Sequence, residues 1–316
     1  MKTIVVTGGL GFMGRHLLKS FSPKSEIVCM DRSRPEEARD RGFLTADLTC
    51  AESVRKAFGR LRPDVVFHLA GKTPPGGTAD FYRVNTMGTI NLLRALQHPG
   101  KTVRVVLVGS AAEYGPVPVT HLPVREDHSC HPEGPYALSK WFASLAGLHA
   151  RPPVETLIAR VFNPIGPGMS SSQAFGRIAR ALAVSEADSI ELKVGDLEAR
   201  RDFIDVRDVA RALIALAERG RANTVYNVGT GQSRKVGKGL DVLKQLSGRI
   251  VTIESSKEIG ARGPSDSRAD IGRISSETGW RPVVPFEESL RDLWEDVQSA
   301  DTDKTSQKHR AWPKAG

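Results

Sequence analysis

Ile4-Val5-Val6-Thr7-Gly8-Gly9-Leu10-Gly11-Phe12-Met13-Gly14 opens the chain with an apolar run that passes into a glycine-rich stretch. The apolar residues predict a buried strand, and the glycines predict a tight turn that leads into a helix. Such a turn presents backbone N–H groups and a helix N-terminus to a pyrophosphate. We expect Gly8 to permit the turn, Gly11 the close approach of the backbone and Gly14 the packing of the helix. The stretch therefore predicts a dinucleotide site, with a purely structural turn as the alternative.

Short apolar runs alternate with amphipathic stretches through the first half of the chain, which is the pattern of β-α-β units. The runs expected to form buried parallel strands are Ile4–Thr7, Ile27–Met30, Val65–Leu69, Val103–Val108 and Thr156–Val161. The helices expected between them are Ala51–Gly59, Phe81–Gln97 and Tyr136–His149. Right-handed crossovers then predict an α/β fold with a Rossmann-type doubly wound parallel sheet.

This rhythm breaks after Asn163-Pro164-Ile165-Gly166-Pro167-Gly168. The elements expected beyond that point are helices at Phe175–Val184, Arg207–Glu218 and Phe286–Val297, and strands at Ile190–Val194 and Val225–Val228. We expect residues 1–165, with 203–232 returning to them, to form the dinucleotide-binding domain. Residues 166–202 and 233–298, the latter built largely of small elements and loops, are expected to form a smaller C-terminal α/β substrate-binding lobe. The polar, basic stretch 299–316 is expected to be a disordered tail.

Composition excludes several classes of partner. The chain has 316 residues and a net charge of +9, but its basic residues are dispersed, so we expect no nucleic acid partner. No apolar run approaches the roughly 20 residues that span a bilayer, so we expect no membrane partner. The first residues lead directly into a strand, so no signal peptide is expected. The three cysteines are scattered, which predicts neither a metal site nor a disulfide framework and favours a cytoplasmic protein.

Two pairs of residues are candidates for the adenosine end of a dinucleotide. Asp31 ends the second strand, where a carboxylate accepts hydrogen bonds from the ribose and repels a 2′-phosphate. Arg32 follows directly and could pair with that phosphate, so NAD(H) is favoured and NADP(H) stays open. Asp47 and Leu48, after the expected third strand, suit an adenine contact, although a plain turn is almost as good an interpretation.

Tyr136-Ala137-Leu138-Ser139-Lys140 carries the expected chemistry. A tyrosine and a lysine four residues apart share one face of a helix. We expect the Lys140 ammonium to favour the phenolate and so to lower the pKa of Tyr136. Ser110, at the carboxyl end of an expected strand, could bind the reacting oxygen while Tyr136 transfers a proton. A strand-end serine with no catalytic role is the alternative for Ser110.

These motifs together resemble the extended short-chain dehydrogenase/reductases, the NAD-dependent epimerase/dehydratase family that acts on nucleotide sugars. The resemblance covers about residues 1–298 and rests on TGGLGFMG, His68-Leu69-Ala70-Gly71, VNTMGTINLL, Ser110, YALSK and Arg160-Val161-Phe162-Asn163. It implies a catalytic Ser110, Tyr136 and Lys140, with Lys140 also holding the nicotinamide ribose. It further places Phe12, Met13, Leu69, Ala70, Gly71 and Asn85 in the cofactor site.

Within the family, VGSAAEYG, RVFNPIGPG and residues 197–209 most resemble the GDP-6-deoxy-D-mannose reductases, which reduce the 4-keto group of GDP-4-dehydro-6-deoxy-D-mannose. This resemblance places Ser110 and Ala111 beside the sugar and Asn163 near the phosphates of the sugar nucleotide. It assigns Arg201 and Arg262 to the diphosphate, which the planar guanidinium fork suits. An ion pair of Arg201 with Asp202 or Asp205 is the structural alternative.

Two departures from the family bear on the reaction. Related 4,6-dehydratases carry an acid and base where this chain has Ala111 and Ala112, and Glu113 stands one position later, on the expected opposite side of the chain. Dehydration is therefore disfavoured. Pro164, Met169 and the serines beyond replace the His and Gln usual in the reductases, in a loop expected to face the sugar.

The leading functional prediction is reduction of a 4-keto-6-deoxy nucleotide sugar, GDP-4-dehydro-6-deoxy-D-mannose to GDP-D-rhamnose, by NAD(H) or NADP(H). A nucleotide-sugar 4-epimerase with tightly bound NAD is the alternative, because it uses the same serine, tyrosine and lysine. A non-catalytic dinucleotide sensor on the same fold is the second alternative. The apolar residues of 136–149 and the family resemblance predict a homodimer with a four-helix interface.

Overall fold

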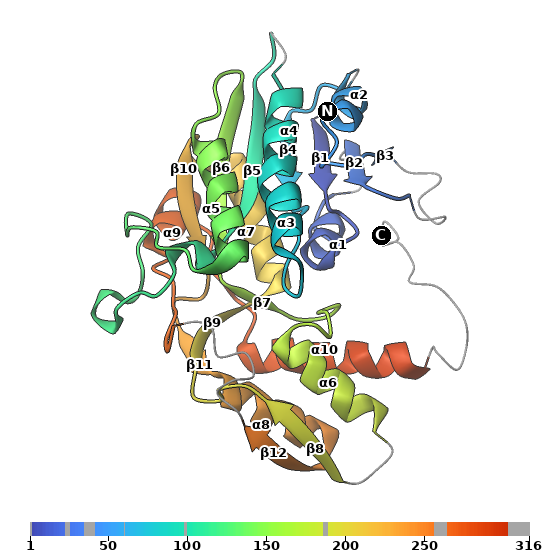
Figure 1. Ribbon diagram of the computed structural model, residues 1–316, viewed down its shortest axis with the longest axis vertical. Coiled ribbons are helices and arrows are strands. Elements are labelled where there is room, and N and C mark those ends of the chain that lie inside the picture. Colours follow the sequence, from blue (N-terminus) through green and yellow to red (C-terminus); the bar gives the residue numbers. More distant parts are fainter. Residues whose placement is uncertain are drawn as a thin grey trace.

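The fold is described from a computed structural model of the chain (Figure 1). The residues that the structure describes are 2–22, 26–34, 42–59, 61–97, 100–185, 189–255 and 264–302.

A seven-stranded sheet forms the larger part of the molecule, and every pair of neighbouring strands in it is parallel. The strand order is β10-β6-β5-β4-β1-β2-β3. The strands are β1 (Thr3–Thr7), β2 (Glu26–Asp31), β3 (Phe43–Thr45), β4 (Val65–His68), β5 (Val103–Ser110), β6 (Val154–Val161) and β10 (Thr224–Val228). The order reverses between β1 and β4, so the predicted doubly wound Rossmann-type sheet is confirmed.

Helices cover both faces of this sheet (Figure 1). One face carries α1 (Phe12–Lys19), α7 (Val206–Arg219) and α9 (Gly272–Thr278), and the other carries α2 (Ala51–Phe58), α4 (Gly88–Ala95) and α5 (Gly134–Leu148). Neighbouring residues of one strand enter opposite cores: Val6 packs on the first face and Val5 on the second. Because both faces are buried, these strands are largely apolar in sequence.

A second lobe lies beyond the carboxyl edge of the sheet (Figure 1). Its described residues form two small sheets, β11-β9-β7 and β12-β8, and three helices. Its elements are β7 (Asn163–Ile165), α6 (Ala174–Val184), β8 (Ser189–Val194), β9 (Arg200–Asp205), β11 (Ser233–Lys235), α8 (Val236–Ser247), β12 (Ile250–Ser255) and α10 (Phe286–Thr302). A separate apolar core, which includes Phe175, Leu240 and Leu290, holds the helices together.

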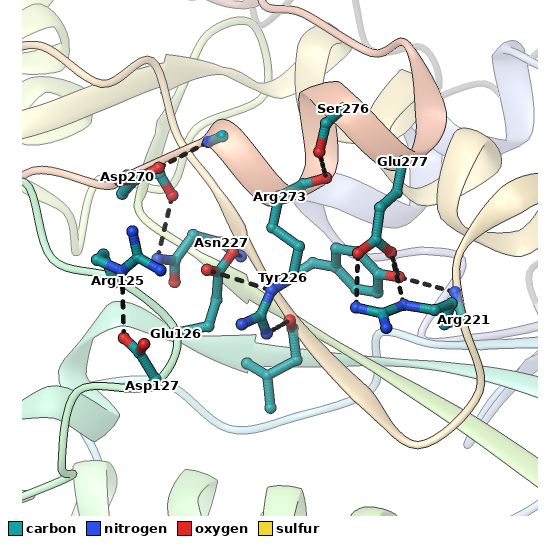
Figure 2. A network of polar contacts seen from close by, with 12 residues as sticks. Arg125, Glu126, Asp127, Arg221, Tyr226, Asn227, Asp270, Arg273, Ser276 and Glu277 are labelled. Carbon is teal, nitrogen blue, oxygen red and sulfur yellow. Dashed lines mark hydrogen bonds and ion pairs between the residues drawn. The ribbon is translucent and has the colours of Figure 1, made fainter.

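A polar network fixes the outer edge of the large sheet at β10 (Figure 2). The Asn227 backbone N–H donates to Glu126 at 3.0 Å, and Glu126 pairs with Arg273 of α9 at 3.6 Å. The Tyr226 hydroxyl donates to Glu277 of α9 at 2.5 Å. These contacts attach the loop around residue 126 and α9 to the last strand.

The structure corrects two predicted boundaries. The helix expected over Phe81–Gln97 is divided into α3 (Thr78–Phe81), a π-helical turn at Tyr82–Met87 and α4. The predicted start of the tail at residue 299 is too early. Helix α10 continues to Thr302, and the Ser299 hydroxyl donates to the Glu295 carbonyl. The rest of the predicted tail, 303–316, lies outside the described residues.

Within the ranges given above, no helix is long and apolar enough to cross a membrane. The same residues contain no group of three or more histidine, cysteine, aspartate and glutamate side chains that could hold a metal ion.

Candidate active site

A cavity of about 860 Å³ lies at the carboxyl edge of the seven-stranded sheet, facing the second lobe. Its wall includes residues that follow β1, β4 and β6, and the end of β5. Ligands of open α/β sheets bind at this edge, where the strand order reverses. The predicted site residues that line the cavity are Gly8, Gly11, Phe12, Met13, Leu69, Gly71, Ser110, Ala111, Tyr136, Lys140, Asn163 and Arg201.

The glycine turn at the end of β1 fits the pyrophosphate of a dinucleotide. Gly8 has a φ of +69°, and a Cβ there would lie 2.6 Å from the Ala70 backbone nitrogen. A Cβ on Gly14 would lie 2.3 Å from the Gly8 carbonyl oxygen, which keeps α1 close to the strand. A helix begins at Phe12, at the cavity wall, and its first N–H groups have no partner within the helix. The roles predicted for Gly8 and Gly14 are therefore confirmed in their geometry.

The residues predicted for the adenosine end lie outside the cavity wall. Asp31 ends β2 and accepts a hydrogen bond from the Arg32 backbone N–H at 2.8 Å. Asp47 accepts hydrogen bonds from the backbone N–H and the hydroxyl of Thr49, both at 2.8 Å, as in a plain turn. Leu48 packs in the core between β-strands and α2. The cofactor roles of these four residues stay predictions.

Asn85 also lies outside the cavity wall, in the π-helical turn, but it braces two segments of that wall. It is 2% exposed, and its side-chain oxygen accepts from the Lys72 N–H at 2.7 Å. Its amide nitrogen donates to the Lys72 carbonyl at 3.0 Å and to Ser139 at 2.9 Å. The Ser139 hydroxyl in turn donates to the Tyr136 carbonyl at 2.7 Å. Asn85 therefore ties the loop after β4, which includes Ala70 and Gly71, to the first turn of α5.

Ser110, Tyr136 and Lys140 meet on one side of the cavity. Ser110 is the last residue of β5, and its hydroxyl oxygen accepts from the Ala112 N–H at 3.2 Å, so its proton stays available. Ser110 acts on the phenol of Tyr136 on α5 and lowers its pKa. One turn further along α5, Lys140 donates to the Val108 carbonyl at 2.5 Å. The structure therefore brings together the three residues predicted for catalysis.

The prediction that Lys140 lowers the pKa of Tyr136 is wrong. Burial raises the pKa of Tyr136 above its usual value, and this outweighs the lowering by the Ser110 hydrogen bond. The charge of Glu113 raises the Tyr136 pKa further. Burial also lowers the pKa of Lys140, whose ammonium is bound to the Val108 carbonyl. Tyr136 is consequently a neutral phenol over the physiological range, in the state that donates a proton.

Glu113 does not line the cavity, whereas Ala111 and Ala112 do. Its side chain is fully buried and pairs with Arg160 at 2.9 Å. The predicted opposite orientation of Glu113 is confirmed. Positions 111 and 112 therefore place no acidic or basic side chain in the cavity wall.

Arg201, on β9 of the second lobe, lines the same cavity as the catalytic trio. One guanidinium nitrogen donates to the carbonyls of Arg200 and Pro264, at 2.8 and 2.6 Å. Burial lowers the pKa of Arg201, so its charge is partly desolvated. Neither alternative ion pair forms within the part of the chain that the structure describes: Asp202 accepts from Thr230 and Asp205 from Arg207.

Asn163 lines the same wall and donates to the Asp202 carbonyl at 3.1 Å. Arg262 lies outside the described residues. The loop predicted to face the sugar does reach the cavity, with Pro164, Met169, Ser170 and Ser172 in its wall. The wall residues that the sequence analysis missed include Lys72, Glu133, Gln173, Phe175, Phe203 and Ser267. Of these, only Lys72 had a sequence signal, because it directly follows the motif at 68–71.

The doubly wound sheet, the glycine turn and the cavity at the carboxyl edge define a dinucleotide-dependent enzyme of the Rossmann class. Residues 4–229 match the model of the NAD dependent epimerase/dehydratase family. The chain belongs to this family of extended short-chain dehydrogenase/reductases, and it is an NAD(P)-dependent enzyme.

Characterised relatives cover almost the whole chain. GDP-6-deoxy-D-mannose reductase of Pseudomonas aeruginosa is 31% identical over 309 residues, which span 94% of this chain and 97% of that protein. The dTDP-6-deoxy-L-talose 4-dehydrogenase (NAD(P)(+)) of Kitasatospora kifunensis is 27% identical, over 92% of this chain and 94% of that protein.

Solved structures show the same fold. RMD from Pseudomonas aeruginosa complexed with NADPH superposes with a TM-score of 0.81 at 30% identity, over 95% of this chain and 100% of that chain. The UDP-glucose 4-epimerase of Thermus thermophilus, in complex with NAD, gives a TM-score of 0.80 at 25% identity, over 94% of this chain and 99% of that chain.

Proposed function

We propose that this enzyme reduces the 4-keto group of a nucleotide-diphosphate sugar, most specifically GDP-4-dehydro-6-deoxy-D-mannose to GDP-D-rhamnose. The observation that carries the proposal is the pairing of a partly desolvated Arg201 with the trio Ser110, Tyr136 and Lys140 across one cavity. The guanidinium suits a diphosphate, and the trio suits a carbonyl on the attached sugar.

The proposed chemistry follows from the states of the side chains. The Ser110 hydroxyl donates a hydrogen bond to the C4 carbonyl oxygen and polarises it. Reduced nicotinamide, when bound, supplies the hydride that C4 accepts. Tyr136, which burial keeps protonated, donates its proton to the same oxygen. Lys140 lies one helical turn away and, by family resemblance, holds the nicotinamide ribose.

Two features favour reduction over dehydration and favour a GDP sugar. Ala111 and Ala112 offer no acid or base for removing water, and Glu113 is bound to Arg160. Guanine as the nucleobase of the substrate is supported by the resemblance of residues 197–209 and by the Pseudomonas relative, which is a GDP-sugar reductase by name. We assign the dinucleotide to the lobe of the large sheet and the sugar nucleotide to the second lobe. The predicted division into residues 1–165 with 203–232 and residues 166–202 with 233–298 departs from these lobes in two places: β7 and β9 form a sheet of the second lobe, and α9 packs on the large sheet.

The diphosphate assignment is tested by calorimetric titration with GDP, UDP and dTDP in the presence of cofactor. We expect GDP to bind most tightly, and Arg201→Ala to weaken its binding about ten-fold or more, since a charge-assisted hydrogen bond contributes about 1.5–3 kcal/mol. Arg55→Ala, at an exposed ion pair with Glu52 on α2, is the matched control and should leave binding unchanged.

Different results of these measurements would contradict the nucleobase, the diphosphate site or the reaction type. Tighter binding of UDP or dTDP would contradict the GDP assignment and leave the nucleotide-sugar reductase in place. Unchanged binding by Arg201→Ala would contradict the diphosphate site. A 4-epimerase would retain NAD through purification and would not consume reduced cofactor in proportion to substrate.

A further inference from the structure

A buried ion pair lies behind the catalytic serine. Glu113 is 0% exposed and Arg160 is 4% exposed, and the Arg160 Nε donates to Glu113 Oε2 at 2.9 Å. Neither residue lines the cavity. Desolvating two charges is costly, and an apolar pair of similar volume is often as stable, so such a pair is a weak source of stability. Its other contacts indicate a different role.

The second oxygen of Glu113 binds the backbone of Ser110. Glu113 Oε1 accepts from the Ser110 N–H at 2.8 Å, while the Ser110 hydroxyl oxygen accepts from the Ala112 N–H at 3.2 Å. These reciprocal bonds close the short 3-10 turn Ala111–Tyr114 onto the end of β5. Both the main chain and the side chain of Ser110 are held at the cavity wall.

The fit around this carboxylate leaves no spare room. A Cβ on Gly109 would lie 2.6 Å from Glu113 Oε1, so the strand can approach the carboxylate only because residue 109 is glycine. A methyl group at this position would push the carboxylate away from the Ser110 N–H.

Arg160 is itself held by Tyr114 of the 3-10 turn, which is bound in turn to β10. It belongs to β6, and its guanidinium lies over the Tyr114 ring, 4.6 Å from the centroid. The Tyr114 hydroxyl donates to the Asn227 side chain of β10 at 2.7 Å. Asn227 is part of the network in Figure 2, where its N–H binds Glu126. The contacts therefore run from the outer edge of the sheet to Ser110.

We infer that Glu113, held by Arg160, is a positioning residue that fixes Ser110 where its hydroxyl meets the substrate carbonyl. This inference rests on the proposed role of Ser110. Glu113 does not touch the reacting atoms, so its positioning effect passes through the serine and is separate from the effect of its charge on the pKa of Tyr136.

A matched pair of double variants tests the inference. Glu113→Gln/Arg160→Met and Glu113→Leu/Arg160→Met both remove the two charges, but only glutamine keeps an acceptor for the Ser110 N–H. With GDP-4-dehydro-6-deoxy-D-mannose, we expect kcat of the leucine variant to be about 10- to 100-fold below that of the glutamine variant, because small misplacements of catalytic groups cost this much. KM should change little between them. Melting temperatures of the two variants report whether both fold.

A double-mutant cycle separates positioning from general damage. In a Ser110→Ala background the leucine and glutamine variants should have the same kcat, because the group that Glu113 positions is gone. A difference that persists there, or equal kcat of the two variants with Ser110 present, overturns the inference. If the leucine variant does not fold, Gly109→Ala replaces it, and wild-type kcat in that variant overturns the inference.

A structural measurement covers the case in which the proposed substrate is not reduced at all, which would contradict the proposed function alone. Crystal structures of the two double variants should show Ser110 in its native position with glutamine and displaced with leucine. The same Ser110 position in both would overturn the inference without reference to turnover.

Discussion

At the scale of the residue, the environment of Tyr136 decides how the site works. Desolvation raises the pKa of the Tyr136 phenol above its usual value, so the acid form meets a substrate at neutral pH. This state suits the protonation of a carbonyl oxygen. A catalytic tyrosine activated by a neighbouring ammonium would instead suit proton removal from a hydroxyl.

Replacing Tyr136 with Phe should remove the proton donor and keep the ring. We expect kcat to fall about 10²–10⁴-fold, with cofactor binding unchanged, since this is the usual contribution of general acid catalysis. Tyr82→Phe makes the same chemical change in the π-helical turn and should keep full activity. Unchanged turnover in Tyr136→Phe would rule out the assigned role.

The same assignment fixes the pH dependence. A proton donor is active below its pKa, and the pKa of Tyr136 is raised, so kcat should stay level through neutral pH and fall only as the pH rises through that raised value. A pH profile of kcat in the wild-type protein measures this. Loss of activity between pH 7 and 8 would contradict it.

The choice of cofactor depends on Asp31 and Arg32. Two unit charges about 4 Å apart in water interact by about 1 kcal/mol, so the Asp31 carboxylate should disfavour a 2′-phosphate about five-fold. We expect kcat/KM for NADH to be at least that for NADPH, and Asp31→Asn to shift the ratio toward NADPH. A strong NADPH preference that Arg32→Ala abolishes would show that the arginine outweighs the carboxylate.

At the scale of the element, the strands of the large sheet were predictable because both of their faces are buried. Val65–Leu69 and Val103–Val108 are largely apolar runs, and the structure places strands at Val65–His68 and Val103–Ser110. β9 was not predictable in this way, because Arg200-Arg201-Asp202 carries charges that serve the cavity and a buried hydrogen-bond network. α8 begins Val236-Gly237-Lys238-Gly239, and two glycines in one turn weaken the helical signal.

The candidate site was predictable to the extent that its residues belong to motifs. Ser110, Tyr136 and Lys140 converge as expected, because parallel strands and the helices that follow them share one edge. The rings of Phe175 and Phe203 are tilted against each other in the cavity wall, with centroids 4.9 Å apart, but nothing in their local sequence distinguishes them from core residues. The pKa of Tyr136 could not be inferred from spacing, since burial rather than Lys140 decides its direction.

The π-helical turn at Tyr82–Met87 braces α5 through Asn85. Asn85→Ala should remove three hydrogen bonds that hold the loop after β4 to α5, and unfolding free energy should fall by about 1–3 kcal/mol for each buried group left unpaired. We also expect a lower kcat, because Tyr136 and Lys140 lie on α5.

Thr278→Val is the control for this prediction. It removes a buried hydroxyl that binds the Ile274 carbonyl in α9, on the other face of the sheet. It should lower stability and leave kcat unchanged. Equal kcat for Asn85→Ala and wild type, measured on folded protein, would contradict the bracing role.

At the scale of the whole molecule, we propose that α5 forms the interface of a homodimer. Phe142 is 40% exposed on α5, and Met87 of the adjacent π-helical turn is 45% exposed. Trp141 packs beside Phe142, with ring centroids 5.5 Å apart, whereas Leu148 packs against the core. Closed two-fold pairing would cover this apolar surface.

Light scattering at micromolar concentration should give twice the chain mass of 34.3 kDa. Replacing Phe142 with Glu should convert the protein to monomers, because burying an unpaired charge in an apolar interface is costly. Ile250→Glu, at a residue that is 69% exposed on β12, is the control and should leave the mass unchanged. A wild-type mass equal to one chain would contradict the dimer.

Transfer of a deuterium label shows whether hydride passes from the cofactor to C4 of a nucleotide sugar. Wild-type enzyme is incubated with GDP-4-dehydro-6-deoxy-D-mannose and reduced cofactor that carries deuterium at the transferable position. We predict one cofactor oxidised for each sugar reduced, with the deuterium at C4 of the product by NMR. Deuterium that stays on the nicotinamide, with the keto sugar unchanged, would contradict the account.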